Sequence, residues 1–226
     1  MEVNNPLYRR QGIHAIASIF TVDKGEVKVL LIKRNNEPYK DMWALVGGAI
    51  HNDEDLEVGL KREVREKTGI NLERYFLANV FGKVKRSPVM RMVAISYIGV
   101  IDRDKVSLVK ETLKTNDADW FSIDKLPRKL AYDHEEILKD SIIKLAKLIG
   151  ETNILKTLLP DCFTMPELQK VYEVILKKEI DRRNFRKRML TLGLIEDTGK
   201  MRKEDNKKAT KLYCFTDKVM DKNVFW

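Results

Sequence analysis

The sequence predicts a mixed α/β domain in its first two thirds and, in its last third, a small module of helices followed by a strand hairpin. Apolar, β-branched runs alternate with turn signals up to residue 123. Two amphipathic helical patterns lie among and after these runs, and beyond Gly150 the pattern is helical first and hairpin-like last. We therefore expect domains at residues 1–150 and 151–226, in contact because no Pro- or Ser-rich spacer separates them.

Strands are expected throughout the first domain. Residues 13–22 and 27–34 are apolar and flank a turn signal at 23–26, so we expect them to form a hairpin. Residues 42–48 are expected to form a short strand that ends in two glycines. The remaining strands are expected at residues 75–84, 91–101 and 117–123.

Two helices are expected in the same domain. Over residues 55–70, Leu56, Leu60 and Val64 recur at four-residue steps, and Gly69 is a natural C-terminal stop. Residues 134–150 form an amphipathic pattern that is closed by a glycine.

Composition limits the class of protein. The 226 residues are 43% hydrophobic and 34% charged, so a core can form and wholesale disorder is excluded. The net charge of +9 favours polyanionic partners such as nucleic acid, phosphates or an acidic membrane surface. Two cysteines and three histidines make a disulfide framework or structural zinc unexpected. The first residues lack the apolar core of a signal peptide and no apolar run reaches about 18 residues, so we expect a cytoplasmic protein without a membrane span.

A glycine turn in the first domain precedes a helix that carries carboxylates. Glu63 and Glu66 are three positions apart, so they share one helix face, and Arg62 can anchor one of them. Two or more carboxylates on one face can hold Mg²⁺, which prefers oxygen ligands and retains waters for phosphate substrates.

This stretch, residues 48–70, resembles the Nudix box, the signature of pyrophosphate-cleaving hydrolases. Eight of its nine specified positions match, and six are identities, namely Gly48, Glu54, Arg62, Glu63, Glu66 and Gly69. The resemblance implies a Nudix-like sandwich, in which a mixed sheet is flanked by helices. In an active member it also implies Mg²⁺ on Glu54, Glu63 and Glu66, with Glu63 and Glu66 as the catalytic residues.

The ninth position departs from the pattern, because Lys67 stands where the family has the second Glu of a pair. Lys67 follows Glu63 by four residues, which is a favourable order for a helix ion pair. An ammonium here competes with Mg²⁺ for Glu63 and repels it. We therefore expect a binding pocket that is retained, no required cofactor, and hydrolysis that is weakened or lost. The alternative is a harmless replacement in an active, Mg²⁺-dependent ADP-ribose pyrophosphatase.

The last third predicts a winged helix-turn-helix. Thr164 can cap a helix that has Pro166 in its first turn, and Asp181 can cap a second helix that ends at Gly193. Strands at 194–196 and 211–215 then surround a basic loop at 199–210, which would form the wing.

The second helix and the wing are rich in positive charge. Residues 151–226 hold 17 Lys and Arg against 12 Asp and Glu, a net charge of +5. In such a module the second helix enters the major groove while the wing reaches phosphates or the minor groove. The expected DNA-binding residues are Arg182, Arg183, Asn184, Arg186, Lys187, Arg188, Lys200, Arg202, Lys203, Lys207, Lys208 and Lys211. The alternatives are a solvated basic helix and a protein-interaction module.

A Nudix-like domain followed by this module resembles the NrtR-type transcriptional regulators. Further segments that resemble the family lie at residues 34–48, 81–97, 131–138, 166–173 and 181–188, with Ser87 replacing an Asp. The resemblance implies a homodimeric repressor or activator that binds a palindromic site in double-stranded DNA. It also implies that the chain senses ADP-ribose or a related nucleotide and controls NAD-metabolism genes. A related branch of this architecture, which senses a sugar such as a pentose and controls sugar-use genes, is a further alternative.

The candidate effector-binding residues are Arg34, Trp43, Gly47, Gly48, Phe81, Arg86, Arg91 and His134. The arginines can pair with phosphates through bidentate contacts, or they can be ordinary surface charge. The two aromatic residues can stack on an adenine or belong to the core. The histidine can touch the effector or transmit its presence to the second domain, or it can be a hydrogen-bonded cap near a helix start.

Overall fold

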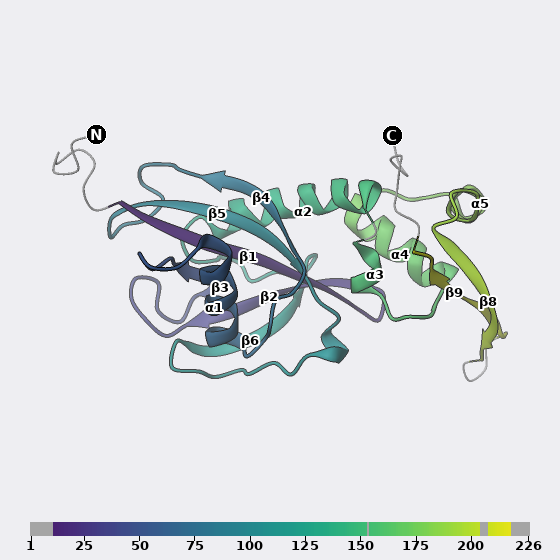
Figure 1. The fold of residues 1–226 in the computed structure, drawn as a ribbon, viewed down its shortest axis with the longest axis horizontal. Helices are drawn as coiled ribbons and strands as arrows, with labels where there is room; N and C mark the ends of the chain where they lie inside the picture. The colour runs from purple at the N-terminus through teal and green to yellow at the C-terminus, as the bar shows by residue number, and fades with distance from the viewer. Residues whose placement is uncertain (1–10, 153, 204–207, 218–226) are drawn as a thin grey trace.

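The computed structural model describes residues 11–152, 154–203 and 208–217. The molecule is elongated, with a six-stranded mixed sheet at one end and a three-stranded sheet with three helices at the other (Figure 1). The strands of the larger sheet are β1 (Gln11–Asp23), β2 (Glu26–Arg34), β3 (Trp43–Ala49), β4 (Tyr75–Phe81), β5 (Arg91–Val100) and β6 (Thr115–Ser122).

The larger sheet has the strand order β4-β5-β1-β3-β2-β6, in which β1 runs parallel to β5 and the other neighbours are antiparallel. β1 pairs with β3 near its start and with β2 near its end. Lys24 and Gly25 both have positive φ at the tight turn between β1 and β2, so the expected hairpin is confirmed. As a central strand, β1 is buried on both faces, which explains its almost unbroken apolar run.

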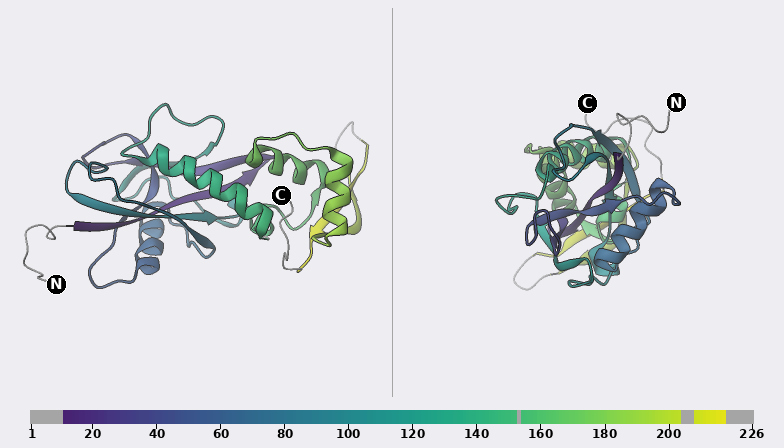
Figure 2. Two further views of the ribbon diagram at one scale, coloured as in Figure 1. Left: turned by 90° about the horizontal axis from the view of Figure 1, so that it is seen from above. Right: turned by 90° about the vertical axis from the view of Figure 1, so that its left-hand side faces the viewer.

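One helix covers each face of this sheet, α1 (Leu56–Thr68) on one and α2 (His134–Glu151) on the other (Figure 2). Alternate strand residues enter two separate cores, as the period of a strand requires. Ile16 and Leu45 belong to the core on the α2 side, whereas Ala17 and Val46 belong to the core on the α1 side. The expected sandwich of a mixed sheet between helices is confirmed.

The carboxylate helix begins and ends close to the predicted limits. Asp55 is the N-cap residue of α1, and Gly69 adopts the left-handed conformation at its C-cap with a φ of 73°. A side chain is strained in that conformation, so the predicted glycine stop is confirmed. Leu60 and Val64 are buried as their spacing predicts. One short 3₁₀ turn, Arg103–Lys105, lies between β5 and β6.

The smaller part contains α3 (Leu155–Leu158), β7 (Phe163–Thr164), α4 (Met165–Leu176), α5 (Arg182–Thr191), β8 (Ile195–Arg202) and β9 (Thr210–Phe215). Its three-stranded sheet has the order β7-β9-β8. Thr164 caps α4 in a reciprocal capping box with Glu167, whose carboxylate accepts from Thr164 N at 2.7 Å. Asp181 caps α5 by accepting from Asn184 N at 2.8 Å. The helix-turn-helix and the hairpin are therefore confirmed.

Details of the smaller part differ from the prediction. The second helix ends at Thr191, two residues before Gly193, which has a φ of 65° just past the helix. β8 extends to Arg202 because an irregularity between Asp197 and Met201 lets the strand continue beyond the expected turn. The predicted wing loop at 199–210 is therefore too long. α3 and β7 were not predicted, because elements of four and two residues carry no periodic signal.

The two parts share one apolar core. The core on the α2 face continues without a break from the large sheet through Leu145 and Leu155 to Val171 and Phe185. The expected contact between the domains is confirmed. Because α2 runs to Glu151 and is followed at once by α3, the domain limit at residue 150 stays a prediction. No helix in the described ranges is both long and apolar enough to cross a membrane.

Candidate functional site

A cavity of about 290 Å³ lies at the larger end of the molecule, between β1, β2, β3, α1 and the start of α2. Its floor is formed by strand residues such as Ile16 and Ala44, together with the two glycines of β3. Its charged lining residues are Arg34, Glu63, Lys67 and Lys114. The cavity therefore combines the Nudix-like helix with groups from five other segments, namely β1, the end of β2, β3, Lys114 and the residues around the start of α2.

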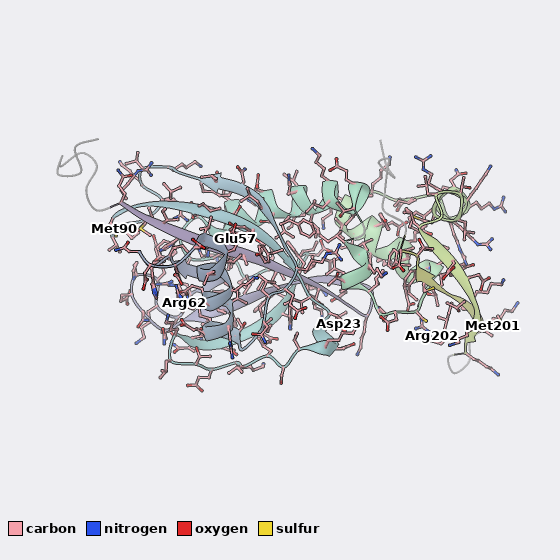
Figure 3. The ribbon with its side chains drawn as sticks, viewed as in Figure 1. Asp23, Glu57, Arg62, Met90, Met201 and Arg202 are labelled. Carbon is pink, nitrogen blue, oxygen red and sulfur yellow. The ribbon has the colours of Figure 1, made fainter. Side chains whose placement is uncertain are left out.

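Arg62, which is labelled in Figure 3, donates to a cluster of carboxylates from α1 and from the loop before it. Its Nε and Nη2 donate to the two oxygens of Glu54 at 2.8 and 2.6 Å. Its Nη1 donates to Glu63 at 2.6 Å and to Glu66 at 3.3 Å. The expectation that this arginine anchors an acid is confirmed, and the arginine in fact joins all three.

Two lysines complete the pairing of these acids. Lys67 Nζ lies 2.9 Å from Glu63 Oε2 and donates to the carbonyl of Gly47. Lys114 Nζ lies 2.6 Å from Glu66 Oε2 and 3.6 Å from Glu63 Oε1. Three cations therefore face three carboxylates, and the cluster is formally neutral.

This pairing stabilises the ionised acids. Hydrogen bonds from Arg62 lower the pKa of Glu54 to about 2. Burial acts to raise the pKa of Glu63, but the charge and hydrogen bonding of Lys67, with help from Arg62, hold it below its usual value. Burial likewise lowers the pKa of Lys67, and the attraction of Glu63 opposes this shift. The attraction between Glu63 and Lys67 therefore offsets the cost of burying each charge.

The Nudix fold implies a magnesium site, and the donor set in this chain does not fit one. Both oxygens of Glu54 are occupied by Arg62, and Glu63 lies between Arg62 and Lys67. A divalent cation would have to displace an arginine and a lysine whose positive charges repel it. Over the described ranges, no group of three or more His, Cys, Asp or Glu is placed to hold a metal ion.

The expected glycine turn is not present, because Gly47 and Gly48 lie within β3 and pair with β1. The two glycines are nevertheless needed for this packing. A Cβ at Gly48 would lie 2.2 Å from Glu63 Oε2, and a Cβ at Gly47 would lie 2.3 Å from the carbonyl oxygen of Ala15. Real Cβ atoms do not approach so closely. The two glycines therefore let β3 lie directly against both the carboxylate and β1.

An aromatic group forms one wall of the cavity. The ring of Tyr132 lies 4.6 Å from that of Tyr39 and 5.6 Å from that of His134, with the Arg34 guanidinium 5.0 Å from its centre. Tyr132 has a φ of 55°, a conformation that is costly outside glycine and that is often found at functional sites. The ring of Tyr132 is therefore held in place by its neighbours.

Both histidines of the cavity are neutral. Leu45 N donates to His134 Nδ1 at 3.0 Å, which ties the start of α2 to β3. Burial and the charge of Arg86 lower the pKa of His134 to about 3. The same two causes, in the same order, lower the pKa of His14 to about 4. The hydrogen-bonded histidine expected at the helix start is therefore present, and it also lines the cavity.

Half of the predicted effector-binding residues line the cavity, namely Arg34, Gly47, Gly48 and His134. The other four lie elsewhere. Trp43 packs edge-on against Phe121 with 4.7 Å between ring centres, and Phe81 packs against the core on the α2 side. The packing of these two aromatic residues agrees with the alternative that they belong to the core. An effector role for them stays a prediction.

The remaining two arginines make contacts within the chain. Arg86 is buried and donates twice to the carboxylate of Asp133, at 2.9 and 2.7 Å, next to the cavity histidine. It is therefore not ordinary surface charge. Arg91 donates to the carbonyl of Lys83 at 3.2 Å. Effector contacts by Arg86 and Arg91 stay predictions.

The cavity residues that the sequence analysis did not single out include His14, Lys114 and Tyr132. Tyr132 lies within a segment already matched to the family, so that segment held a usable signal. His14 and Lys114 come from a strand and a turn without any motif, and only the fold brings them to α1.

A second charged surface lies at the other end of the molecule. α5, β9 and the start of α4 enclose a hollow of about 820 Å³. Its basic lining residues are Arg182, Arg183, Arg186, Lys187 and Lys211. Arg186 Nε donates to Tyr213 Oη at 3.4 Å, which connects α5 to β9. The structure therefore brings these five predicted residues together on one surface.

The other predicted DNA-binding residues are more dispersed. Asn184 and Arg188 line a separate hollow of about 710 Å³ between α5, α4 and the end of α2. Arg202 is paired with Glu167 at 2.5 Å and lies on the wing strand labelled in Figure 3. Lys200, Lys203 and Lys208 are exposed near the wing, and Lys207 lies outside the described residues. DNA contacts by all of these residues stay predictions.

Comparison with known families assigns both parts of the chain. The model described as the NUDIX domain matches residues 12–141, and the model described as the NrtR DNA-binding winged helix domain matches residues 156–215. The predicted fold class, a Nudix-like sandwich followed by a winged helix-turn-helix, is therefore confirmed.

Individual relatives agree with this assignment. The chain is 32% identical over 209 residues to the ADPR responsive transcriptional repressor NtrR of Acinetobacter baylyi, covering 91% of this chain and 82% of that protein. It is 33% identical to the ADP-ribose pyrophosphatase of Methanocaldococcus jannaschii, over 58% of this chain and 75% of that protein. The crystal structure of Shewanella oneidensis NrtR complexed with a 27mer DNA is 28% identical and has a TM-score of 0.73, covering 93% of this chain and 98% of that one. With agreement over nearly its whole length, the chain belongs to the NrtR family, which joins a Nudix domain to a winged helix DNA-binding domain.

Proposed function

We propose that this chain is a DNA-binding transcriptional repressor whose Nudix domain binds ADP-ribose or a closely related nucleotide. The proposal rests on one observation, the presence in a single chain of a cation-lined cavity and an exposed basic helix joined by α2. The relative from Acinetobacter baylyi is described as ADPR responsive, which supports the choice of effector.

The charge of the cavity suits a phosphate-bearing ligand. Its charged lining consists of Arg34, Lys67 and Lys114 against Glu63, a formal net charge of +2. A diphosphate diester carries two negative charges and is complementary to this lining. Tyr132 then offers an aromatic face to a base or sugar ring. A neutral sugar would use the polar groups of this site but leave its positive charge uncompensated.

Helix α2 provides a physical connection from the cavity to the DNA-binding part. Its first residue, His134, lines the cavity, and near its other end the carbonyl of Ile149 accepts a hydrogen bond from Tyr172 Oη of α4 at 3.5 Å. A helix of this length spans about 27 Å. A ligand that shifts His134 therefore acts on α4, and through the shared core on α5. Coupling energies of this kind are typically about 1–3 kcal/mol.

On DNA, α5 would enter the major groove and the β8–β9 wing would reach the backbone. Two chains in a homodimer would grip the two halves of a palindromic site. We expect the regulated genes to be those of NAD metabolism. A cytoplasmic location is also part of this proposal.

The test is a titration of the full-length chain against labelled promoter fragments of NAD-metabolism genes, with and without ADP-ribose. We expect a salt-sensitive DNA complex that ADP-ribose shifts by about five- to 150-fold in affinity. Absence of a complex at low salt would refute DNA binding. A complex that ignores ADP-ribose would refute the coupling.

A second candidate function is Mg²⁺-dependent hydrolysis of ADP-ribose to AMP and ribose 5-phosphate. The near-complete box and the pyrophosphatase relative favour it, whereas the pairing of Lys67 with Glu63 opposes it. Product assays with Mg²⁺ or Mn²⁺ decide between them. If the wild-type chain turns over ADP-ribose and Glu63→Gln abolishes this activity, the chain is a hydrolase. If the wild-type chain is inactive and Lys67→Glu becomes active, the result supports the regulator.

Ligand screening distinguishes an ADP-ribose sensor from a pentose sensor with the same architecture. Because a ligand that binds the folded state raises the melting temperature, ADP-ribose, NAD, other nucleotides and pentoses can be ranked by thermal shift. We expect ADP-ribose to give a larger shift than any pentose, and the reverse order would favour the sugar sensor.

A further inference from the structure

Two lysines from distant segments converge on one carboxylate in the cavity. Lys67 comes from α1 and lies 2.9 Å from Glu63 Oε2, whereas Lys114 comes from the segment before β6 and lies 3.6 Å from Glu63 Oε1. Lys114 is also paired with Glu66 at 2.6 Å, but Glu66 does not line the cavity. The lining residues Arg34, Lys67 and Lys114 against Glu63 therefore give a formal net charge of +2, which a bound anion would compensate.

The Lys114 side chain is presented by a hydrogen-bonded turn. Thr112 and Thr115 exchange backbone hydrogen bonds of 2.9 and 3.3 Å, and Lys114 N donates to Thr112 Oγ1 at 3.1 Å. The turn is also tied to β2, because Asn35 Nδ2 donates to the carbonyl of Leu113 at 2.6 Å. Asn35 itself lines the cavity. The turn thus places a charged group at the cavity wall.

Lys67 has donor capacity left for a ligand. An ammonium carries three N–H donors. Among the residues that the structure describes, its partners are the carboxylate of Glu63 and the carbonyl of Gly47. Lys67 lines the cavity although its side chain is only 13% exposed. A donor in such a partly desolvated position binds an anion more strongly than one in open water.

The box carboxylates of this chain do not fit a divalent cation, yet a diphosphate still requires positive charge beside it. We propose that Lys67 and Lys114 together supply this charge and bind the diphosphate of the effector directly, so that effector binding needs no metal ion. The ligand class is a nucleotide diphosphate held by two ammonium groups. This inference rests on the proposed function, because it assigns the phosphate-binding groups of the same cavity.

The decisive experiment is calorimetric titration of the full-length chain with ADP-ribose, in excess EDTA and again in millimolar MgCl₂. We expect the two dissociation constants to agree within about twofold, since no metal-mediated contact is lost. Binding that occurs only with MgCl₂, or that is at least about tenfold tighter with it, would overturn the inference but leave an ADP-ribose-binding regulator in place. Absence of binding in both buffers would overturn the effector assignment and this inference together.

Variants then test the two lysines. Lys114→Gln removes one charged contact and should weaken binding about tenfold in both buffers. Lys110→Gln is the matched control, because Lys110 lies in the same segment, pairs with Asp119 at 3.8 Å and does not line the cavity. Equal affinities for the two variants would overturn the role of Lys114.

Lys67→Glu restores the family acid and should reverse the metal dependence. We expect no measurable binding in EDTA and recovered binding in MgCl₂, because the acid now needs a cation between itself and the diphosphate. Unchanged binding in EDTA would overturn the role of Lys67. A melting curve with and without MgCl₂ verifies that the variant is folded, and the wild-type titrations decide the main point even if it is not.

Discussion

The two basic regions of this molecule contain similar side chains in opposite electrostatic situations. Beside the cavity, Arg62 is paired with Glu54 from the loop before α1, and Lys67 and Lys114 are paired with Glu63 and Glu66 from α1. On α5, Arg183 and Lys187 make no ion pair within the described ranges, and both are exposed. The number of basic residues in a segment therefore does not decide its role. The placement of acids decides whether positive charge is paired within the fold or left unpaired.

The largest expected effect concerns the unpaired region. Arg183→Ala combined with Lys187→Ala should weaken DNA binding by roughly a hundredfold. The slope of log affinity against log salt should become shallower by about two, because each lost cation means that one fewer counterion is released from the DNA on binding. Fluorescence anisotropy over a range of salt concentrations measures both quantities.

The matched control for this prediction is Arg128→Ala combined with Lys129→Ala, which removes the same charge from an exposed loop of the Nudix domain. Equal loss of DNA binding in both double variants would mean that net charge, rather than the α5 surface, is responsible.

The paired region should instead respond to steric change. Gly48→Ala places a methyl group 2.2 Å from a carboxylate oxygen of Glu63, so we expect the free energy of unfolding to fall by about 1–3 kcal/mol. Urea unfolding measures this loss. Gly82→Ala is the control, since its Cβ would have nothing nearer than 3.9 Å, and its stability should change by less than about 1 kcal/mol. A tolerant Gly48 would show that the cluster is loosely packed.

Lowering the pH should reduce the free energy of unfolding, because the two histidines of the cavity are neutral in the folded chain. Their pKa values lie near 3 for His134 and near 4 for His14 in the folded chain, against 6.5 for the free side chain. Between pH 4 and 6.5 the unfolded chain therefore binds more protons, so stability falls as the pH is lowered. At pH 5 each histidine costs at most about 2 kcal/mol relative to pH 7. Unfolding of wild type and His14→Gln at both pH values measures this, and an equal pH response would contradict it.

The smallest expected effect tests the capping box of α4, in which Glu167 is hydrogen-bonded to Thr164. Thr164→Ala removes half of the capping box with Glu167 and should cost about 1 kcal/mol of unfolding free energy. Thr191→Ala, at the exposed end of α5, should change stability by less than about 0.5 kcal/mol. Equal costs would mean that the capping box does not stabilise α4.

The strands, the long helices and their caps were predictable because each depends on local periodicity and on a few capping residues. Asp55, Thr164, Asp181 and Gly69 all occupy the positions that their types favour. Local signals also located α5 and its exposed basic residues, since burial of Phe185 and Met189 leaves the arginines outside.

The composition of the cavity was only partly predictable. Lys114 reaches Glu66 across 48 positions of sequence, and His14 reaches the cavity because β1 happens to be the central strand. Likewise, the pairing of Arg86 with Asp133 joins residues 47 positions apart, and no motif predicted it. Such long-range pairings depend on how the sheet is assembled, and no spacing rule within the chain encodes them.

The unbroken apolar core between the large sheet and α5 has a thermodynamic consequence. Cutting the chain near residue 150 would expose side chains such as Leu155 and Phe163 on one fragment and part of the sheet face on the other. The effector-binding and DNA-binding parts should then melt as one cooperative unit, with a single calorimetric transition. A ligand that stabilises either part would raise the melting temperature of the whole molecule.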